Sequence, residues 1–209
     1  MVWSGAVLIV LSLLLFLLIF YPVLKEEFNY RFGGDKVPDN AAVVITTDPS
    51  ANAQNAIVPA NSDFSIIVPK IGGNAPVVPN IDPQSESSYR TALRDGVAHA
   101  KGSALPNIQG NTFLFAHSSD NFYEANRYNT VFYLLHKMEI DDEFMIVYDD
   151  RVYNYNVTGT QEVRPEAVEY LEKGEDNKQT ATLMTCWPPG TAASRLLIHG
   201  ELTEIEDLP

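Results

Sequence analysis

The sequence predicts an all-β domain, an antiparallel barrel or sandwich, preceded by one transmembrane helix. Three observations support this prediction. From residue 62 onward, short runs rich in β-branched and aromatic residues are separated by turn formers. The candidate helices are few and brief, and the long strand-helix alternation of parallel sheets is absent. The first 24 residues carry no charged side chain and are mostly Leu, Ile, Val and Phe.

The N-terminal run is long enough to cross a bilayer as a helix. At about 1.5 Å per residue, residues 2–24 span a hydrocarbon core of about 30 Å. A cleaved signal peptide would have a basic start and a small-residue cleavage site, and this run has neither. We therefore expect a retained single-pass membrane anchor over residues 1–24. Lys25 and Arg31 follow it, and the positive-inside rule alone would keep that side in the cytoplasm.

Residues 25–61 carry few large apolar side chains and many small or polar ones, which is typical of a flexible stalk. Residues 43–45 fit a short strand within it. The remaining residues, 62–209, are enough for one domain with its own core. The chain has a formal net charge of −13, which disfavours binding to nucleic acid or to an anionic membrane surface.

The elements of the folded part follow from periodicity and turn residues. The candidate strands are residues 64–68, 75–78, 112–117, 143–148, 152–159, 180–186 and 195–204. The candidate helices are residues 87–94, residues 130–137, and a short one that Pro165 opens and that runs to Leu171. Residues 149–151, with the sequence Asp-Asp-Arg, predict a hairpin turn between two strands.

Cys186 is the only cysteine of the chain, so it cannot form a disulfide within it. The ordinary role of a free cysteine is that of a small buried hydrophobe. Cys186, however, ends a predicted strand, on the same face as Thr182 and Met184. The next predicted strand begins at Arg195. Two adjacent strands joined by residues 187–194 would place Cys186 and Arg195 near each other at one end of the sheet.

A cysteine acts as a nucleophile in its thiolate form, which a nearby base or cation favours. Among four histidines, His117 is the best candidate because it ends an apolar strand and opens a polar loop. We expect His136 to be a helix-surface or packing residue. We expect His199 to be a core or edge residue of the last strand. Arg195 stays charged and offers a rigid fork of donors for an oxyanion or a substrate carbonyl.

These motifs together resemble the sortases, which are membrane-anchored cysteine transpeptidases of bacteria. The resemblance covers most of residues 64–204 and leaves the subclass open. Its motifs are Ile-Val-Pro-Lys-Ile-Gly at 67–72, Gly-Val-Ala-His at 96–99, Phe-Leu-Phe-Ala-His-Ser at 113–118, Thr-Leu-Met-Thr-Cys at 182–186 and Arg-Leu-Leu-Ile at 195–198. The resemblance implies a closed eight-stranded β-barrel with short helices over residues 62–209. His99 lies in a recurring segment of the family and is not expected to be catalytic.

The resemblance also implies the chemistry. Cys186 would be the nucleophile, His117 the general acid and base, and Arg195 the stabiliser of substrate and oxyanion. The enzyme would cleave a C-terminal sorting signal similar to Leu-Pro-x-Thr-Gly through a thioester. It would then transfer the acyl group to an amine, such as a cell-wall precursor or a pilin lysine, and so attach surface proteins on the outer side of the cell membrane.

The expected signal-binding groove includes the segment from Pro165 to Thr180, where the specificity loop of the family lies. The candidate substrate-binding residues are Ala116, Ser118, Val168, Leu171 and Thr185. We expect no metal and no cofactor, because the acidic residues 141–143 are of a kind that is ordinarily just solvated in turns.

Three other functions are weighed against this one. Pilin-building sortases often carry a lid with an Asp-Pro-aromatic motif, and residues 82–84, Asp-Pro-Gln, lack the aromatic residue. Papain-like peptidases place the cysteine before the histidine, whereas here His117 comes first. A non-enzymatic alternative is an anchored β domain that binds a surface partner, with Cys186 buried and inert.

Overall fold

The computed structural model describes residues 56–118, 131–167, 170, 177–189 and 191–209, and, before these, residues 5, 7, 9–16, 21, 28, 44 and 45. Contacts divide the chain into two compact units, Met1–Lys36 and Val37–Pro209. In the first unit, residues 9–16 are helical. None of the helices among the described residues is both long and apolar enough for a membrane span.

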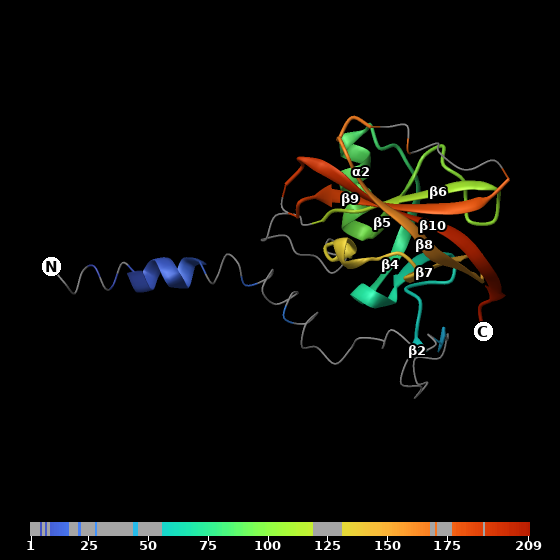
Figure 1. The fold of residues 1–209 in the computed structure, drawn as a ribbon, viewed down its shortest axis with the longest axis horizontal. Helices are drawn as coiled ribbons and strands as arrows, with labels where there is room; N and C mark the ends of the chain where they lie inside the picture. The colour runs from blue at the N-terminus through green and yellow to red at the C-terminus, as the bar shows by residue number, and fades with distance from the viewer. Residues whose placement is uncertain are drawn as a thin grey trace. The chain divides into compact units, whose positions relative to one another are not determined.

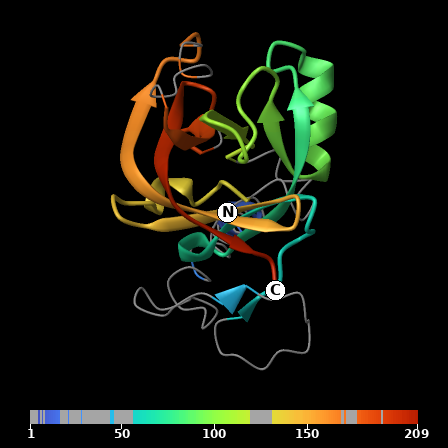
Figure 2. The same cartoon turned by 90° about the vertical axis from the view of Figure 1, so that its right-hand side faces the viewer.

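The second unit contains a closed barrel of eight strands, as expected (Figures 1 and 2). The order around the barrel is β10-β8-β7-β3-β4-β5-β6-β9, and the pairs β4/β5 and β6/β9 are parallel. The strands are β3 (Phe64–Val68), β4 (Gly73–Ile81), β5 (Val97–Ala100), β6 (Gly110–Phe115), β7 (Glu143–Tyr148), β8 (Arg151–Val163), β9 (Gln179–Trp187) and β10 (Ser194–Asp207).

Short helices complete the unit. The helix α2 (Glu86–Asp95) connects the parallel strands β4 and β5 and lies alongside them (Figure 2). It buries Ala92 and Leu93. Two single turns of 3₁₀ helix, η1 (Pro69–Ile71) and η2 (Leu135–Lys137), lie elsewhere in the barrel connections.

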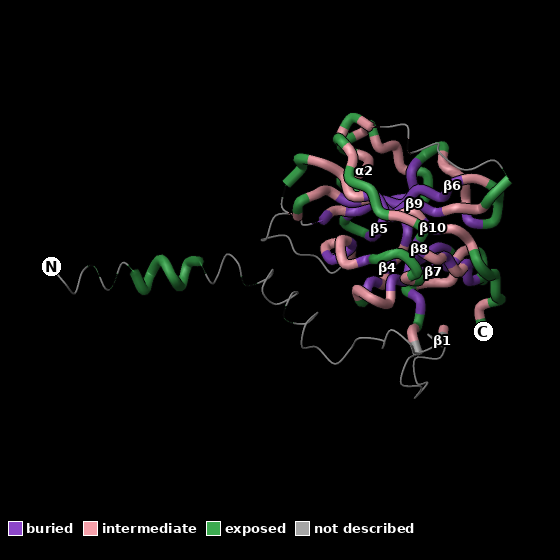
Figure 3. Tube along the Cα trace, viewed as in Figure 1, coloured by how far each residue is buried: buried purple, intermediate pink, exposed green. Residues whose placement is uncertain are grey.

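Burial alternates along β4 and along part of β8, as the period of a strand predicts, whereas every residue of β3 and β5 is buried. Figure 3 shows the buried positions along the barrel strands. The side chains of Ile66, Phe144, Tyr155, Leu183 and Ile198 are fully buried and belong to one cluster. The rings of Phe144 and Tyr155 stack there, with centroids 5.2 Å apart. This packed interior makes the barrel strands a rigid support for side chains at their ends.

The hairpin between β7 and β8 confirms the predicted turn. Tyr148 pairs with Arg151, so the turn has two central residues. Asp149 and Asp150 both have positive φ, 52° and 58°. A two-residue turn with positive φ at both positions matches the right-handed twist of the strands, and Asp tolerates this conformation better than most residues.

Several elements differ from the prediction. β5 was not predicted, because its four residues, Val-Ala-His-Ala, show no alternation of polar and apolar side chains. A helix was predicted over residues 130–137. The described residues 131–137 instead form a turn followed by η2, and so short a segment does not offset the cost of starting an α-helix. Pro165 and Glu166 form a turn, and the rest of that predicted helix lies outside the described residues, apart from Ala167 and Tyr170.

A small apolar cluster lies on the other face of β3 from Ile66. Ile67 packs there with Met145, Val147 and Val152, and the partly buried Ile45, Ile57 and Leu208 lie against them. Ile45 and Ile57 belong to two short parallel strands, β1 (Val44–Ile45) and β2 (Ala56–Ile57). The short strand predicted at residues 43–45 is thus present as β1, and it contributes to the outer face of the barrel.

Candidate active site

The pairing of β9 with β10 places Cys186 directly opposite Arg195. Opposed residues of an antiparallel pair point to the same side of the sheet, with Cβ atoms about 5 Å apart. Cys186 is a free thiol with intermediate exposure. The expected proximity of Cys186 and Arg195 is therefore confirmed.

The parallel pair β6/β9 brings His117 to the same end of the sheet. Phe115 is the last residue of β6 and pairs with Met184. Beyond the strand, the Ala116 N–H donates to the Met184 carbonyl (3.1 Å), and the Thr185 hydroxyl donates to the Ala116 carbonyl (3.0 Å). Thr185 is buried. These two bonds hold the backbone that carries His117 against the strand that carries Cys186.

His117, Cys186 and Arg195 all line one cavity of about 510 Å³. Its apolar lining comes from α2, β6, β9 and β10, through Tyr89, Leu93, Phe113, Phe115, Met184 and Leu197. Pro83 and Gln84 line it before α2, and Pro165, Ala167 and Tyr170 line it after β8. No described lining residue carries a carboxylate. The cavity is a largely apolar groove, and the basic side chains among its described lining residues are His117 and Arg195, beside the Cys186 thiol.

Contacts within the β9/β10 connection orient the guanidinium of Arg195. Its Nη1 donates to the carbonyls of Ser194 (3.1 Å) and Ala192 (3.4 Å). The Ser194 hydroxyl lies 3.0 Å from the Trp187 carbonyl and 2.6 Å from Glu162 Oε1. A planar guanidinium fixed beside a thiol can donate hydrogen bonds to a carbonyl oxygen that develops negative charge.

Among the described residues, no other histidine lines the cavity. His136 packs against the indole of Trp187, with ring centroids 5.0 Å apart, as expected for a packing residue. His99 is buried and accepts from the Asn80 N–H at Nδ1 (3.3 Å). Burial lowers the pKa of His99, and the backbone hydrogen bond to Ala104 opposes this only in part.

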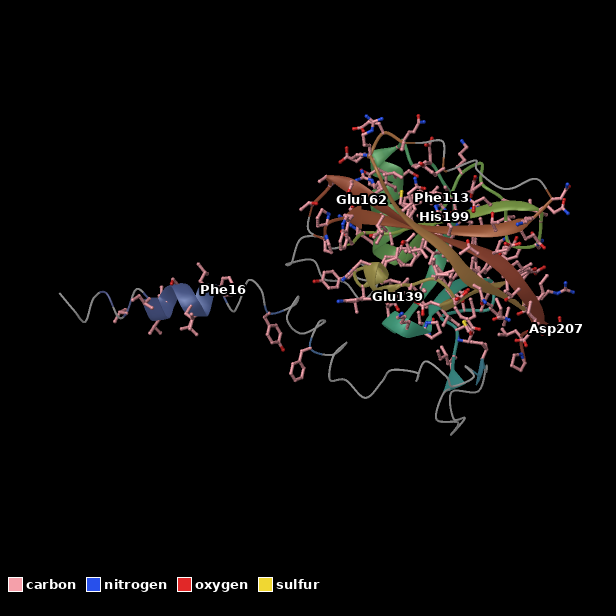
Figure 4. The ribbon with its side chains drawn as sticks, viewed as in Figure 1. Phe16, Phe113, Glu139, Glu162, His199 and Asp207 are labelled. Atoms are coloured by element: carbon pink, nitrogen blue, oxygen red, sulfur yellow. The ribbon has the colours of Figure 1, made fainter. Side chains whose placement is uncertain are left out.

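His199 lies in β10 at the edge of the core, as predicted. Phe113, Thr182 and His199 are lateral neighbours on β6, β9 and β10; Figure 4 labels Phe113 and His199. The Thr182 hydroxyl lies 3.2 Å from His199 Nδ1.

The candidate substrate-binding residues divide into two groups. Ala116, Ser118 and Thr185 line the cavity. Val168 and Leu171 lie outside the described residues. The sequence analysis missed Tyr89 and Leu93, which α2 brings to the cavity from one face of the helix. Their spacing of four residues is a helical signal that could have indicated a shared face.

Of the acidic residues 141–143, Asp142 takes part in an ion-pair network with Lys70 and Glu139. Lys70 Nζ lies 2.8 Å from both Asp142 Oδ2 and Glu139 Oε2. Burial by itself would lower the pKa of Lys70, but the hydrogen bonds to Asp142 and Glu139 raise it, and Lys70 in turn lowers the pKa of Glu139. The described part of the chain holds no group of three or more His, Cys, Asp or Glu suited to a metal.

Comparison with known proteins agrees with this geometry. The family model of the Sortase domain matches residues 66–203. No match was found among the curated proteins. Among solved structures, the chain is similar to a pilus-related sortase C of Group B Streptococcus, with 26% identity, a TM-score of 0.58 and 69% coverage of each chain.

Two further solved structures are similar to the chain. A lid mutant of sortase A from Corynebacterium diphtheriae is 26% identical, with a TM-score of 0.57 and coverage of 70% of this chain and 72% of that one. Sortase C-1 from Actinomyces oris shares the fold at 24% identity, with a TM-score of 0.58 and coverage of 69% and 76%. With the family model matching most of the barrel, the chain belongs to the sortase family.

Proposed function

We propose that this chain is a cysteine transpeptidase that cleaves a C-terminal sorting signal of the Leu-Pro-x-Thr-Gly type and transfers the acyl part to an amine. The observation that carries the proposal is the register that sets Cys186 opposite Arg195, in a cavity that His117 also lines. A thiol, an imidazole and a guanidinium at one apolar groove can supply the nucleophile, the acid and base, and the oxyanion stabiliser of an acyl transfer.

In the first step, the Cys186 thiolate attacks the carbonyl carbon of the scissile peptide bond. Negative charge develops on the carbonyl oxygen, and the Arg195 guanidinium donates hydrogen bonds to it. The C–N bond then breaks, and protonated His117 gives its proton to the departing amine. The products of this step are a thioester on Cys186 and a free amine.

In the second step, an acceptor amine gives a proton to His117 and attacks the thioester carbonyl. The C–S bond breaks, and Cys186 leaves as a thiolate. One amide bond has been exchanged for another, so the reaction needs no external energy source. The covalent intermediate separates cleavage from transfer, which lets an amine rather than water accept the acyl group.

The cavity lining supports a peptide with apolar side chains as the substrate. Its described walls include four aromatic rings, those of Tyr89, Phe113, Phe115 and Tyr170, and no carboxylate. Ala116, Ser118 and Thr185 are the proposed contacts near the reacting bond. The predicted contacts Val168 and Leu171 stay predictions.

The acceptor is an amine of a cell-wall precursor or of a pilin lysine. The likeness to a pilus-related sortase C supports testing the pilin alternative alongside the cell-wall one. Full-length enzyme, a signal peptide, and either a short glycine peptide or a lysine-containing pilin peptide would distinguish them. Ligated product with only one acceptor assigns the acceptor class.

We further propose that residues 1–24 anchor the enzyme in the bacterial cell membrane, with the catalytic domain, residues 62–209, outside the cytoplasm. The support is the uncharged run of residues 2–24, which has the length of a single span. Membrane fractionation of the full chain, compared with a variant carrying Leu13→Lys and Leu17→Lys, tests this. Equal recovery of both proteins in the soluble fraction would contradict the anchor.

The test of the reaction is intact-protein mass spectrometry of the full chain in detergent with a library of sorting-signal peptides. The expected result is an adduct on Cys186 with the mass of the acylating fragment, and its absence from a Cys186→Ala variant. If no peptide yields an adduct or a ligated product, the inert β domain that binds a surface partner becomes the better account.

A further inference from the structure

We propose that a second cavity, at one mouth of the barrel, binds a sugar ring of a glycan. The cavity has a volume of about 580 Å³, within the range of about 300–1,000 Å³ that is typical of small-molecule sites, and the mouths of barrels often hold such sites. Its described lining comes from the start of β3, the ends of β4, β5 and β7, and the segment after β5. The inference goes beyond the proposed function and does not depend on it.

The second cavity is separate from the catalytic one. The two share no described lining residue. His99 on β5 lines the second cavity and pairs with Leu114 on β6, so these two side chains lie on one face of the strand pair. Phe113 and Phe115 point to the other face of β6 and line the catalytic cavity. A ligand in the second cavity therefore leaves the catalytic groove open.

A bulge in β4 shapes the rim of the second cavity. The pairing of β4 with β5 changes register between Val78 and Ile81, so Pro79 and Asn80 lie outside the regular ladder. Asn80 has a φ of 60°, a left-handed conformation that Asn adopts more readily than most residues. Bulges re-aim side chains and are frequent next to functional sites. Asn80 is exposed, and its carboxamide makes no hydrogen bond to another described residue.

A buried histidine and two aromatic rings make a rigid, uncharged floor. His99 is 4% exposed, and its Nδ1 accepts from the Asn80 N–H at 3.3 Å. Nε2 therefore carries the ring proton and donates to the Ala104 carbonyl at 3.1 Å. Burial lowers the pKa of His99, which keeps the imidazole neutral. The Phe64 ring packs between His99 and Tyr148, with centroids 5.7 Å and 5.1 Å away.

The contact between Ser103 and His99 is not a pair of nucleophile and base. Ser103 Oγ lies 2.9 Å from His99 Nε2, but it donates its proton to the Ala100 carbonyl (2.8 Å) and accepts from the Phe113 N–H (3.2 Å). Because Nε2 carries the imidazole proton, it cannot take one from Ser103. The cavity is thus built for binding and not for nucleophilic catalysis.

The polar groups left for a ligand include one carboxylate and, among the described lining residues, no Lys or Arg. They are the carboxylate of Asp63, the carboxamide of Asn80, the hydroxyl of Tyr148 and the Nδ2 of Asn61. Asn61 Oδ1 is already used, since it accepts from the Phe64 N–H at 2.7 Å. An anionic ligand would find a carboxylate and no described cation to pair with.

A sugar ring matches this set of groups. Its C–H face is apolar and can pack on the half-buried ring of Tyr148, while its hydroxyls both donate and accept hydrogen bonds. The Asp63 carboxylate accepts from such hydroxyls, and Asn61 Nδ2 donates to them. An ammonium group could use Asp63 and the Tyr148 ring, but it would leave the Asn61 donor without an acceptor. The cavity therefore favours a neutral polyhydroxylated ring over a cation.

The experiment measures glycan binding to the full chain in lauryldimethylamine oxide, because a glycoside detergent would compete for the cavity. The probes are triacetylchitotriose, maltotriose and, for the cationic alternative, Nα-acetyl-lysine amide. Saturation-transfer NMR detects binding, and isothermal titration calorimetry gives Kd. We expect a trisaccharide to bind and the lysine derivative not to bind.

Variants place the bound sugar in the cavity. Asn80→Gly keeps the left-handed backbone and its N–H but removes the carboxamide, so we expect Kd to rise about three- to tenfold. Tyr148→Phe keeps the ring and loses the hydroxyl, for which we expect a rise of about threefold. Tyr148→Ala also removes the packing surface and should weaken binding about tenfold or more. Asn177→Gly is the matched control, because Asn177 also has a left-handed φ, 67°, and lies outside this cavity.

Three results would overturn the inference. The first is that neither trisaccharide binds to the folded wild type, and the second is that only the lysine derivative binds. The third is saccharide binding that Asn80→Gly and Tyr148→Phe leave unchanged, because the sugar then lies elsewhere; these two variants suffice even if Tyr148→Ala does not fold. Binding to Cys186→Ala should equal that of the wild type, so the result stands apart from the proposed transpeptidase reaction.

Discussion

Replacing Thr185 by Val tests how the barrel holds His117 against Cys186. The side chains of threonine and valine have nearly the same shape, so this substitution removes one hydroxyl group and leaves the packing almost unchanged. The lost bond is the 3.0 Å contact from Thr185 to the Ala116 carbonyl, and Thr185 is 2% exposed. Leaving a buried acceptor without its donor costs about 1–3 kcal/mol.

The lost hydrogen bond holds the backbone next to His117. We therefore expect part of the free-energy cost to result from a displacement of His117 relative to Cys186. A displacement that raises the activation free energy by about 1.4–2.8 kcal/mol lowers the rate of thioester formation about 10- to 100-fold. The assay is the single-turnover rate of Cys186 thioester formation in the full chain, together with the melting temperature. Thr203→Val is the matched control, because Thr203 makes a similar bond to the Asn154 carbonyl at an exposed position. If Thr185→Val forms the thioester as fast as the control does, the proposed positioning of His117 by Thr185 is wrong.

Three further outcomes are expected. Arg195→Lys keeps the positive charge but loses the planar fork of donors, so kcat should fall about 10²-fold while the melting temperature stays unchanged. A kcat near that of the wild type would argue against oxyanion stabilisation by Arg195. Gly96→Ala places a Cβ against the Pro76 carbonyl oxygen, so unfolding free energy should drop by about 1–3 kcal/mol in chemical denaturation. Folding lowers the pKa of His99, so the unfolded chain binds more protons than the folded chain as the pH falls. The free energy of unfolding should therefore be constant above about pH 6.5 and decrease below it. The decrease should be less steep in His99→Gln.

The closeness of Cys186 and Arg195 could be predicted from the sequence because it depends only on adjacent strands. Cys186 and Arg195 flank one connection between antiparallel strands, and opposed residues of such strands share a face. His117 follows β6, which pairs in parallel with β9, the strand that carries Cys186. Strand alternation and the positions of the turn residues are enough to place Cys186 and Arg195 at one edge. The parallel pairing of β6 with β9, which brings His117 to the same edge, was not predicted.

The walls of the cavity could not be predicted in the same way, because they depend on tertiary packing. Tyr89 and Leu93 reach the cavity only because α2 packs beside β4 and β5, and β5 itself has no alternation of polar and apolar residues that would have predicted it. Tyr170 lies in the connection between β8 and β9. In that segment no strand or helix periodicity of apolar residues indicates which side chains face the cavity. The partners of Tyr170, which are Asn111 and Gln161, are separated from it by 59 and 9 residues.

The most direct test of the central claim is the mass of Cys186 after reaction with a sorting-signal peptide. The full chain in detergent is mixed with the peptide, quenched with acid and digested, and the fragment that contains Cys186 is weighed. The proposed function predicts a thioester of the acyl fragment on Cys186, which disappears when an acceptor amine is added, as ligated product forms. An unmodified Cys186 across the whole peptide library, in a protein whose thiol still reacts with iodoacetamide, would contradict it.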